Sequence, residues 1–143
     1  MLDSGCTIVV GRGTKFNNRG ARINCGEPKT HVRIGAECLL SDVKMRTSDQ
    51  HSIIDMNSGL RTNPPKDICI ENGVWVAEDV YIYKGAKIGP GTIVGARATV
   101  TGKLPASSLC LGTPAKAVRS GVTWRDEPLP IFKKDKSECH ELA

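Results

Sequence analysis

The stretch from Ile70 to Pro105 decides the fold, because it divides into six blocks of six residues: IENGVW, VAEDVY, IYKGAK, IGPGTI, VGARAT and VTGKLP. Each block begins with a β-branched aliphatic residue: Ile70, Val76, Ile82, Ile88, Val94 and Val100. The fifth place holds mostly small residues: Val74, Val80, Ala86, Thr92, Ala98 and Leu104. An amphipathic helix repeats about every 3.6 residues and a half-buried strand every second residue. A period of six fits neither pattern.

This period indicates a solenoid in which each block is one short strand with a corner, and three blocks close one coil. The first residue of a block should point inward and stack on its equivalents in adjacent coils, about 4.8 Å away. The fifth residue should also point inward, where the coil narrows. The fourth place forms the corner and needs a backbone that accepts positive φ, which Gly73, Gly85, Gly91 and Asp79 can supply. The alternative, an ordinary β-sandwich, would produce such a register only by chance.

The whole chain, at 143 residues, has the length of one domain. We expect a β-helix domain over residues 1–112 and a C-terminal segment and tail over residues 113–143. No apolar run reaches the length of a membrane span and no signal-peptide pattern follows Met1, which predicts a cytoplasmic protein without membrane insertion. The charge balance, 20 basic against 15 acidic residues, is modest, and we expect no nucleic-acid partner.

Six cysteines are spread along the chain without a CxxC pair, so neither a disulfide framework nor a zinc cluster is predicted. We expect reduced thiols, several of them buried as small apolar residues: Cys6, Cys25, Cys38, Cys69, Cys110 and Cys139.

Residues 1–45 carry a degraded form of the same register, and the register lapses again between Met45 and Ile68. We therefore predict a loop over about 46–68 that leaves the coil and returns. Solenoids commonly place such insertions on a functional face, although an insertion without a role is the alternative. Residues 125–143 are expected to form a loosely ordered tail or an arm that reaches a neighbouring subunit.

Three histidines limit the search for a catalytic base. His140 lies in the tail and His31 precedes a strand, whereas His51 lies in the predicted loop. A neutral imidazole can accept a proton near pH 7, and a well-placed base raises a rate by roughly 10²–10⁴-fold. The chain has no Gly-x-Ser-x-Gly elbow and no Cys-His motif, which favours direct attack of an acceptor on a thioester without a protein nucleophile.

The repeat, the segment 48–53 (SDQHSI), Asn63-Pro64 and residues 74–76 (VWV) together resemble the sugar and polysaccharide O-acetyltransferase branch of the hexapeptide-repeat acyltransferases. This resemblance implies an all-β, left-handed parallel β-helix. Periodicity alone leaves the handedness open. The resemblance also implies a homotrimer with active sites between subunits. It assigns His51 as the general base and a backbone N–H near Ala77 as the donor that stabilises the oxyanion.

The resemblance extends to the coenzyme A segment, in residues 94–96 (VGA) and 112–119 (GTPAKAVR). It implies that Gly95 and Ala96 lie along the pantetheine arm of acetyl-CoA, and that Lys103, Lys116 and Arg119 are candidates for its phosphates. Two further basic residues, Lys84 and Lys87, are expected to be solvated. Trp75 either packs against another subunit or lines the acceptor and thioester cleft. Asp49 could orient His51 or bind a sugar hydroxyl of the acceptor, and Asn63 could do the latter.

The expected function is transfer of an acetyl group from acetyl-CoA to a hydroxyl of a sugar or surface polysaccharide, without a metal. N-acetylation of an amino sugar and O-acetylation of serine would need the same base and donor. A zinc hydratase resembling carbonic anhydrase is a second class, and it requires three converging imidazoles, of which His31 and His51 supply two. A non-catalytic β-helix is the third class.

Overall fold

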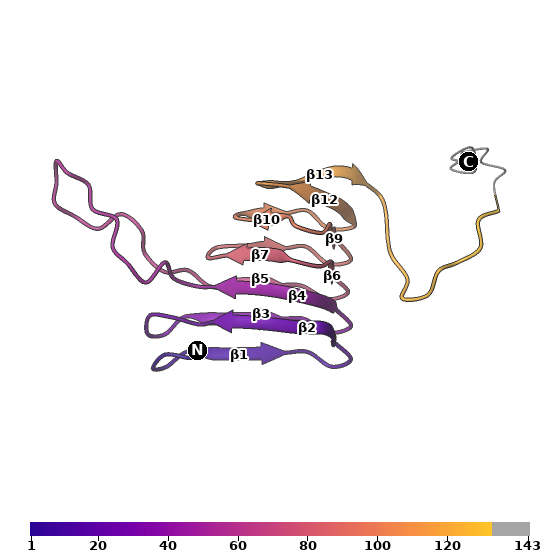
Figure 1. Cartoon of the computed structure of the whole chain (residues 1–143), viewed down its shortest axis with the longest axis horizontal. Coiled ribbons are helices and arrows are strands. Elements are labelled where there is room, and N and C mark those ends of the chain that lie inside the picture. The colour runs from indigo at the N-terminus through magenta and orange to yellow at the C-terminus, as the bar shows by residue number, and fades with distance from the viewer. Residues whose placement is uncertain (133–143) are drawn as a thin grey trace, which may run out of the picture.

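The computed structural model describes residues 1–132, which form a three-sided parallel β-helix with one extruded loop and a C-terminal segment (Figure 1). His140 and Cys139 lie outside the described residues. No helix occurs among residues 1–132, so none in that range could cross a membrane. The all-β prediction from the repeat is confirmed.

The strands form three sides, which we name by their order along a coil. The first side stacks β1 (Thr7–Val10), β3 (His31–Ile34), β5 (Ile68–Ile70), β8 (Lys87–Ile88) and β11 (Lys103–Leu104). The second side stacks the first parts of β2 (Lys15–Asn24) and β4 (Leu39–Arg46), then β6 (Trp75–Val76), β9 (Ile93–Val94) and β12 (Ser108–Gly112). The third side stacks the second parts of β2 and β4, then β7 (Val80–Tyr83) and β10 (Thr99–Val100). These pairs are parallel, and β13 (Ala115–Ser120) turns back antiparallel onto β12.

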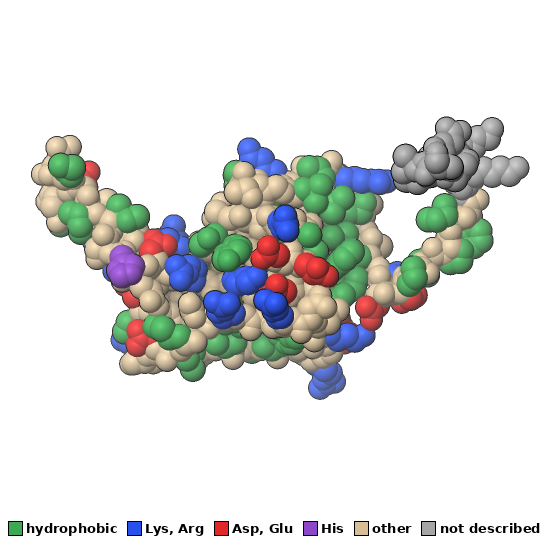
Figure 2. All heavy atoms as spheres, viewed as in Figure 1, with side chains coloured by type: hydrophobic (Ala, Val, Ile, Leu, Met, Phe, Trp, Pro, Cys, Tyr) green, Lys and Arg blue, Asp and Glu red, His purple; other side chains and the backbone are tan. Residues whose placement is uncertain are grey.

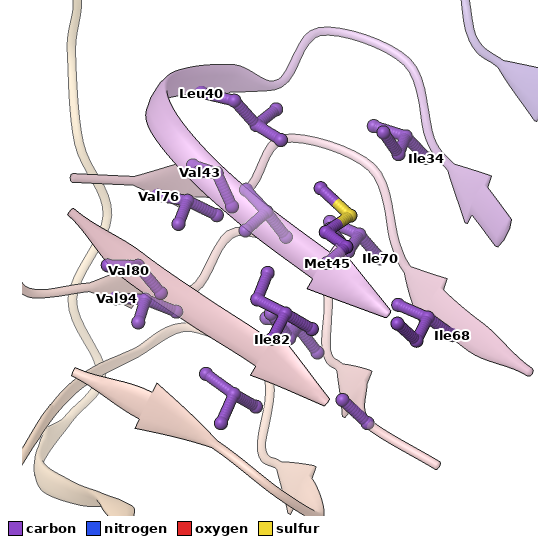
Figure 3. Packing of buried hydrophobic residues seen from close by; sticks show 14 of the residues in the cluster. Ile34, Leu40, Val43, Met45, Ile68, Ile70, Val76, Val80, Ile82 and Val94 are labelled. Atoms are coloured by element: carbon purple, nitrogen blue, oxygen red, sulfur yellow. The ribbon is translucent and has the colours of Figure 1, made fainter. Parts of the chain in front are cut away.

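The core is the set of inward-pointing columns that run through the coils (Figure 3). On the second side, Leu40 pairs with Val76 and Val76 with Val94, so equivalent residues stack from coil to coil. Every first-place and fifth-place residue of the hexad between Ile70 and Leu104 is buried, as the period predicts. The hydrophobic effect therefore fixes the register, because a shift by one residue would turn this column toward solvent.

The corners have the predicted left-handed backbone at Gly73 (φ 66°) and Asp79 (φ 57°). Arg97 occupies the same fourth place with φ 62°, although its residue type gives no such signal. A left-handed conformation costs a residue with a Cβ atom roughly 1–2 kcal/mol. The stacked corners of the neighbouring coils hold Arg97 in this conformation.

The first coil is exposed on its lower face. Ile8, Val10 and Phe16 occupy inward positions in register with buried residues of the second coil. Their side chains are 37%, 43% and 43% exposed, because no coil of the described residues lies beneath them.

The extruded loop lies between the end of β4 at Arg46 and the start of β5 at Ile68, which confirms the predicted range. It projects from the corner between the third and first sides (Figure 1). An isolated antiparallel bridge joins Ile54 to Arg61. Its large apolar side chains are at least half exposed: Ile53, Ile54, Met56 and Leu60.

The cysteines agree with the expectation of reduced thiols. Five are described as free, and four of these are buried: Cys6, Cys25, Cys38 and Cys110.

Candidate active site

A polar network holds the base of the loop on either side of His51. The Asp49 carboxylate accepts a hydrogen bond from Lys84 Nζ at 2.7 Å and from Asn63 Nδ2 at 2.8 Å. Asn63 Nδ2 also donates to the His51 carbonyl oxygen at 2.8 Å. The expectation of a solvated Lys84 is wrong, because its ammonium group pairs with the loop. Lys87, in β8, is exposed as expected.

Asn63 is buried, and the chain itself uses the whole hydrogen-bonding capacity of its amide. Its Oδ1 accepts from the Ile53 N–H at 2.8 Å and from Arg61 Nε at 3.0 Å. An amide offers two donor hydrogens and two acceptor lone pairs, and all four are engaged here. Asn63 therefore fixes the backbone around His51.

A second clamp joins the loop to the corner after β2. The Arg61 guanidinium donates to both carboxylate oxygens of Glu27, at 2.7 Å and 2.8 Å, and the Ser48 hydroxyl also donates to Glu27. The Arg61 guanidinium, followed by the Ser48 hydroxyl, lowers the pKa of Glu27 to about 2. Sequence reasoning missed this clamp, because nothing in the chain marks two residues so far apart as partners.

The His51 side chain is exposed at the loop. Within residues 1–132 no hydrogen bond reaches its imidazole ring, and the Asp49 carboxylate faces Lys84 and Asn63. The network therefore positions the backbone of His51 and leaves both ring nitrogens available to a ligand. The described residues contain no group of three metal-binding side chains, and His31 Nδ1 lies 2.7 Å from the Thr7 hydroxyl on the first side.

A shallow recess of about 490 Å³ lies at the corner between the second and third sides. It brings together three residues singled out from the sequence, Trp75, Ala77 and Ala96. Polar residues complete its wall: Asn17, Asn18, Ser41, Glu78 and Asp126, with Leu39 beside them. The stacking of β6 on β9 places these residues on successive coils.

The recess contains two backbone donors that the β-helix does not use. The Ala77 N–H donates to the Val94 carbonyl at 2.9 Å, as an ordinary rung of the coil. The next residue, Glu78, has an N–H that donates to no group of residues 1–132, and the same holds for Ala96 one coil further on. The same feature occurs at the equivalent place of other hexads: Asn72, Lys84 and Gly102. Glu78 and Ala96 are exposed and line the recess, so an acceptor atom of a ligand there can replace water at either N–H.

The remaining candidate residues divide between two sides. Lys116 and Arg119 lie on β13, opposite Leu111 and Leu109 of β12, so they share the second side with the recess. Gly95 lies under Leu111, since a Cβ atom at Gly95 would come within 2.2 Å of Leu111 Cδ2. Lys103 lies on β11 of the first side, and β11 contacts β13.

His51 and the recess lie at different corners of one chain. The loop leaves the corner between the third and first sides, whereas Ala77 and Ala96 lie at the corner between the second and third sides. The four residues of β7 span this gap, which at about 3.3 Å per residue is roughly 13 Å. Figure 1 shows the loop on the left and β6 and β9 on the right.

Comparison with known proteins identifies the family. The model of the bacterial transferase hexapeptide family, described as six repeats, matches residues 70–102. This chain belongs to the hexapeptide-repeat transferases. It is 35% identical over 134 residues to a polysialic acid O-acetyltransferase of Escherichia coli O1:K1, an alignment that covers 92% of this chain and 43% of that protein. It is 34% identical over 91 residues to the putative colanic acid biosynthesis acetyltransferase WcaF of Escherichia coli K12, covering 64% of this chain and 48% of the relative.

Solved structures agree with this placement. The crystal structure of the polysialic-acid-specific acetyltransferase NeuO superposes with a TM-score of 0.82 at 34% identity, over 93% of this chain and 61% of that one. The polysialic acid O-acetyltransferase OatWY gives 0.82 at 30% identity, over 90% and 60%. These neighbours are left-handed β-helices, so the handedness implied by the resemblance is confirmed. The chain of this hexapeptide-repeat transferase spans less than half of the two curated relatives.

Proposed function

We propose that this hexapeptide-repeat transferase moves an acetyl group from acetyl-CoA to a hydroxyl of a polysaccharide sugar, at sites between the subunits of a homotrimer. The observation that carries the proposal is the recess that gathers Trp75, Ala77 and Ala96, with the exposed N–H groups of Glu78 and Ala96 open to a ligand. The similarity of this chain to O-acetyltransferases that act on polysialic acid supports the same reaction class.

In the proposed reaction His51 is the general base. Its unprotonated ring nitrogen accepts the proton of the acceptor hydroxyl while the hydroxyl oxygen bonds to the thioester carbonyl carbon. The tetrahedral intermediate then collapses, the C–S bond breaks, and the coenzyme A sulfur leaves and takes the proton from the imidazolium. The acetyl ester and free thiol are the products, and no protein side chain is acylated.

The oxyanion of that intermediate is assigned to the Glu78 N–H. The resemblance points to a donor near Ala77. Because the Ala77 N–H already donates to the Val94 carbonyl, we assign the donor to the next residue, Glu78. A preorganised backbone donor at this position typically contributes about 10²–10³-fold to kcat. Ala96, stacked one coil further on, then offers its N–H to an amide carbonyl of the pantetheine arm.

The phosphates of coenzyme A are assigned to the far end of the second side. Lys116 and Arg119 lie there, on β13. The pantetheine arm would then run along the second side from Ala96 toward Leu111, and Leu111 must move if the arm is to contact Gly95. Lys103 lies on β11 of the first side, which contacts β13, and is kept as a third candidate for these phosphates. Charged contacts here increase affinity for the donor and do not take part in the chemistry.

We propose a homotrimer because His51 and the donor recess lie at different corners of one chain. In a closed three-fold ring, the loop corner of one subunit meets the recess corner of the next. The apolar loop residues Ile53, Ile54 and Met56 would then cover the second side of the neighbour. Burying such side chains stabilises each by about 1.5–3 kcal/mol relative to exposure, which gives the exposed loop a reason to be apolar.

The deciding experiment measures release of the coenzyme A thiol from acetyl-CoA with a panel of acceptors: an anionic glycan, a neutral oligosaccharide, an amino sugar and serine. We expect ester formation on a glycan, and loss of about 10²–10⁴-fold in kcat/KM in His51→Ala. The matched control is His31→Ala, which removes an imidazole on the first side. Transfer that survives in His51→Ala, or equal losses in both variants, would refute the assignment of the base. Acetylation of only the amino sugar or only serine would refute the proposed sugar hydroxyl and identify that compound as the acceptor.

A further inference from the structure

The C-terminal segment 122–126, which we name the strap, runs back after β13 over the corner between the first and second sides. The Val122 N–H donates to the Ser107 carbonyl at 3.0 Å, in the last coil. The Asp126 carboxylate accepts a hydrogen bond from Lys15 Nζ at 2.7 Å, at the start of β2. The strap therefore crosses the β-helix from its last coil to its first, and it descends on the right of Figure 1.

Between these two ends, Trp124 packs against Trp75. The ring centroids are 5.9 Å apart and the ring planes are inclined by 45°. The Trp124 Nε1–H donates to the Gly73 carbonyl at 2.7 Å, two residues before Trp75. A tilted aromatic pair at this separation is attractive, and the hydrogen bond fixes the position of the second indole.

Trp75 thus has two different neighbours. Trp124 lies against its indole, and the recess with Ala77 and Ala96 lies beside it. Asp126 of the strap reaches the same recess. Any shift of the Trp75 ring changes the shape of the wall next to the Glu78 N–H, where the thioester is expected.

We propose that the strap is part of the active-site wall and that Trp124 is a positioning residue that holds the Trp75 indole for donor binding. This inference rests on the proposed acetyl transfer for its catalytic consequence, but the contact between the indoles does not depend on it. Trp124 acts through Trp75 and touches no reacting atom.

The Asp126 end of the strap is attached weakly. In the ion pair between Lys15 and Asp126 the side chains are 65% and 53% exposed, and exposed pairs of this kind stabilise little. Trp124 is the half-buried anchor between the two ends of the strap. Removal of its ring should therefore free the strap and the Trp75 ring while the stacked coils remain folded.

The test uses the fact that the chain contains two tryptophans. In Trp124→Phe and Trp124→Ala, indole fluorescence reports on Trp75 alone. Phenylalanine keeps an aromatic neighbour but loses the hydrogen bond to Gly73, whereas alanine loses both. We expect acrylamide quenching of Trp75 to be about twofold stronger in the alanine variant than in the phenylalanine variant.

In the same variants the KM for acetyl-CoA should rise about tenfold with alanine and about twofold to threefold with phenylalanine, with a smaller loss in kcat. The melting temperature of both variants is measured to confirm that the β-helix is folded. Phe132→Ala is the matched control, because this aromatic side chain lies beyond the strap and is 92% exposed, and the variant should leave KM and quenching unchanged.

An unchanged KM in folded Trp124→Ala overturns the positioning role, whatever the quenching shows. Equal quenching in the two Trp124 variants overturns the contact between the indoles. If the wild-type chain transfers no acetyl group to any acceptor, the proposed function fails, and the quenching comparison still decides whether Trp124 holds Trp75.

Discussion

The Nζ atom of Lys84 lies 2.7 Å from Oδ2 of Asp49 and so ties the turn after β7 to the loop two residues before His51. Lys84 is 20% exposed and Asp49 34% exposed, so the pair is partly shielded from solvent. Lys84, and then Asn63, lower the pKa of Asp49. The position of the proposed base therefore depends on a cation from the next coil.

The first prediction tests this dependence. Lys84→Met keeps the aliphatic stem and removes the charge, which leaves Asp49 without its cation. We expect kcat/KM for acetyl transfer to fall about tenfold, because small displacements of a general base are costly. Lys87→Met, on the first side, is the control. A loss of the same size in both variants would show that overall charge matters and not this contact.

The second prediction concerns the clamp between Arg61 and Glu27. Glu27→Gln and Arg61→Met each remove it, and we expect the loop amides around Asn63 to exchange hydrogen about tenfold faster in both variants. The effect of the double variant should be smaller than the two single effects combined, since both variants remove the shared ion pair, while Arg61 also bonds Asn63 and Glu27 also bonds Ser48. Additive effects would show that each residue stabilises the loop separately.

The third prediction is the pH dependence of the same clamp. The pKa of Glu27 is lowered in the folded chain to about 2 from an ordinary value of 4.5. A carboxylate with a depressed pKa contributes stability that is fully present above its unfolded pKa and is lost as pH falls through the folded value. Protection of the loop amides, measured against the exchange rate of an unstructured peptide at the same pH, should thus stay constant down to about pH 4.5 and fall between about pH 4.5 and 2. Glu27→Gln should lack this fall in protection, and an identical acid response in that variant would assign it to another group.

The fourth prediction compares two glycines. Gly91 forms a corner with φ 72°, and a Cβ atom there would meet Ser107 Oγ at an ordinary 3.6 Å. Gly91→Ala should therefore lower the free energy of unfolding by roughly 1–2 kcal/mol through backbone strain alone. Gly102 has no positive φ and open space around it, so Gly102→Ala should be neutral or stabilising by up to about 1 kcal/mol. Chemical denaturation measures both, and equal values would contradict the corner assignment.

The fifth prediction tests the proposed homotrimer. If the loop corner meets the recess corner of the next subunit, the third side between them faces the three-fold axis. Tyr81 lies on that side, with Lys44 Nζ 5.4 Å from its ring centroid. Tyr81→Arg should place cations of three subunits close together and reduce the mass in solution from three chains to one. Val9→Arg, at an exposed position of the first side, should leave the mass unchanged, and a trimeric Tyr81→Arg would contradict this arrangement.

The sequence by itself determined the β-helix, because its core is a one-dimensional pattern. The residue that begins each block from Ile70 onward stacks on the residue that begins the block three blocks later, as Ile70 does on Ile88 and Val76 on Val94. The repeat along the chain therefore gives the contacts in the core directly. The same register predicts the corner at Gly73, because glycine tolerates positive φ at the fourth place. It also predicts the loop after Arg46, because the pattern lapses there. Arg97 shows the limit of this reasoning, because neighbouring coils impose its corner conformation.

The tertiary structure decided the contacts that no period encodes. Glu27 and Arg61, Lys84 and Asp49, and Trp124 and Trp75 are each far apart in sequence. Each pair meets because a residue of the loop or the strap, outside the coils, folds back onto a residue of a coil. The unused N–H of Glu78 is likewise visible only once the Ala77 N–H is seen to bond to Val94, since hydrogen bonding between coils depends on which residues lie above and below.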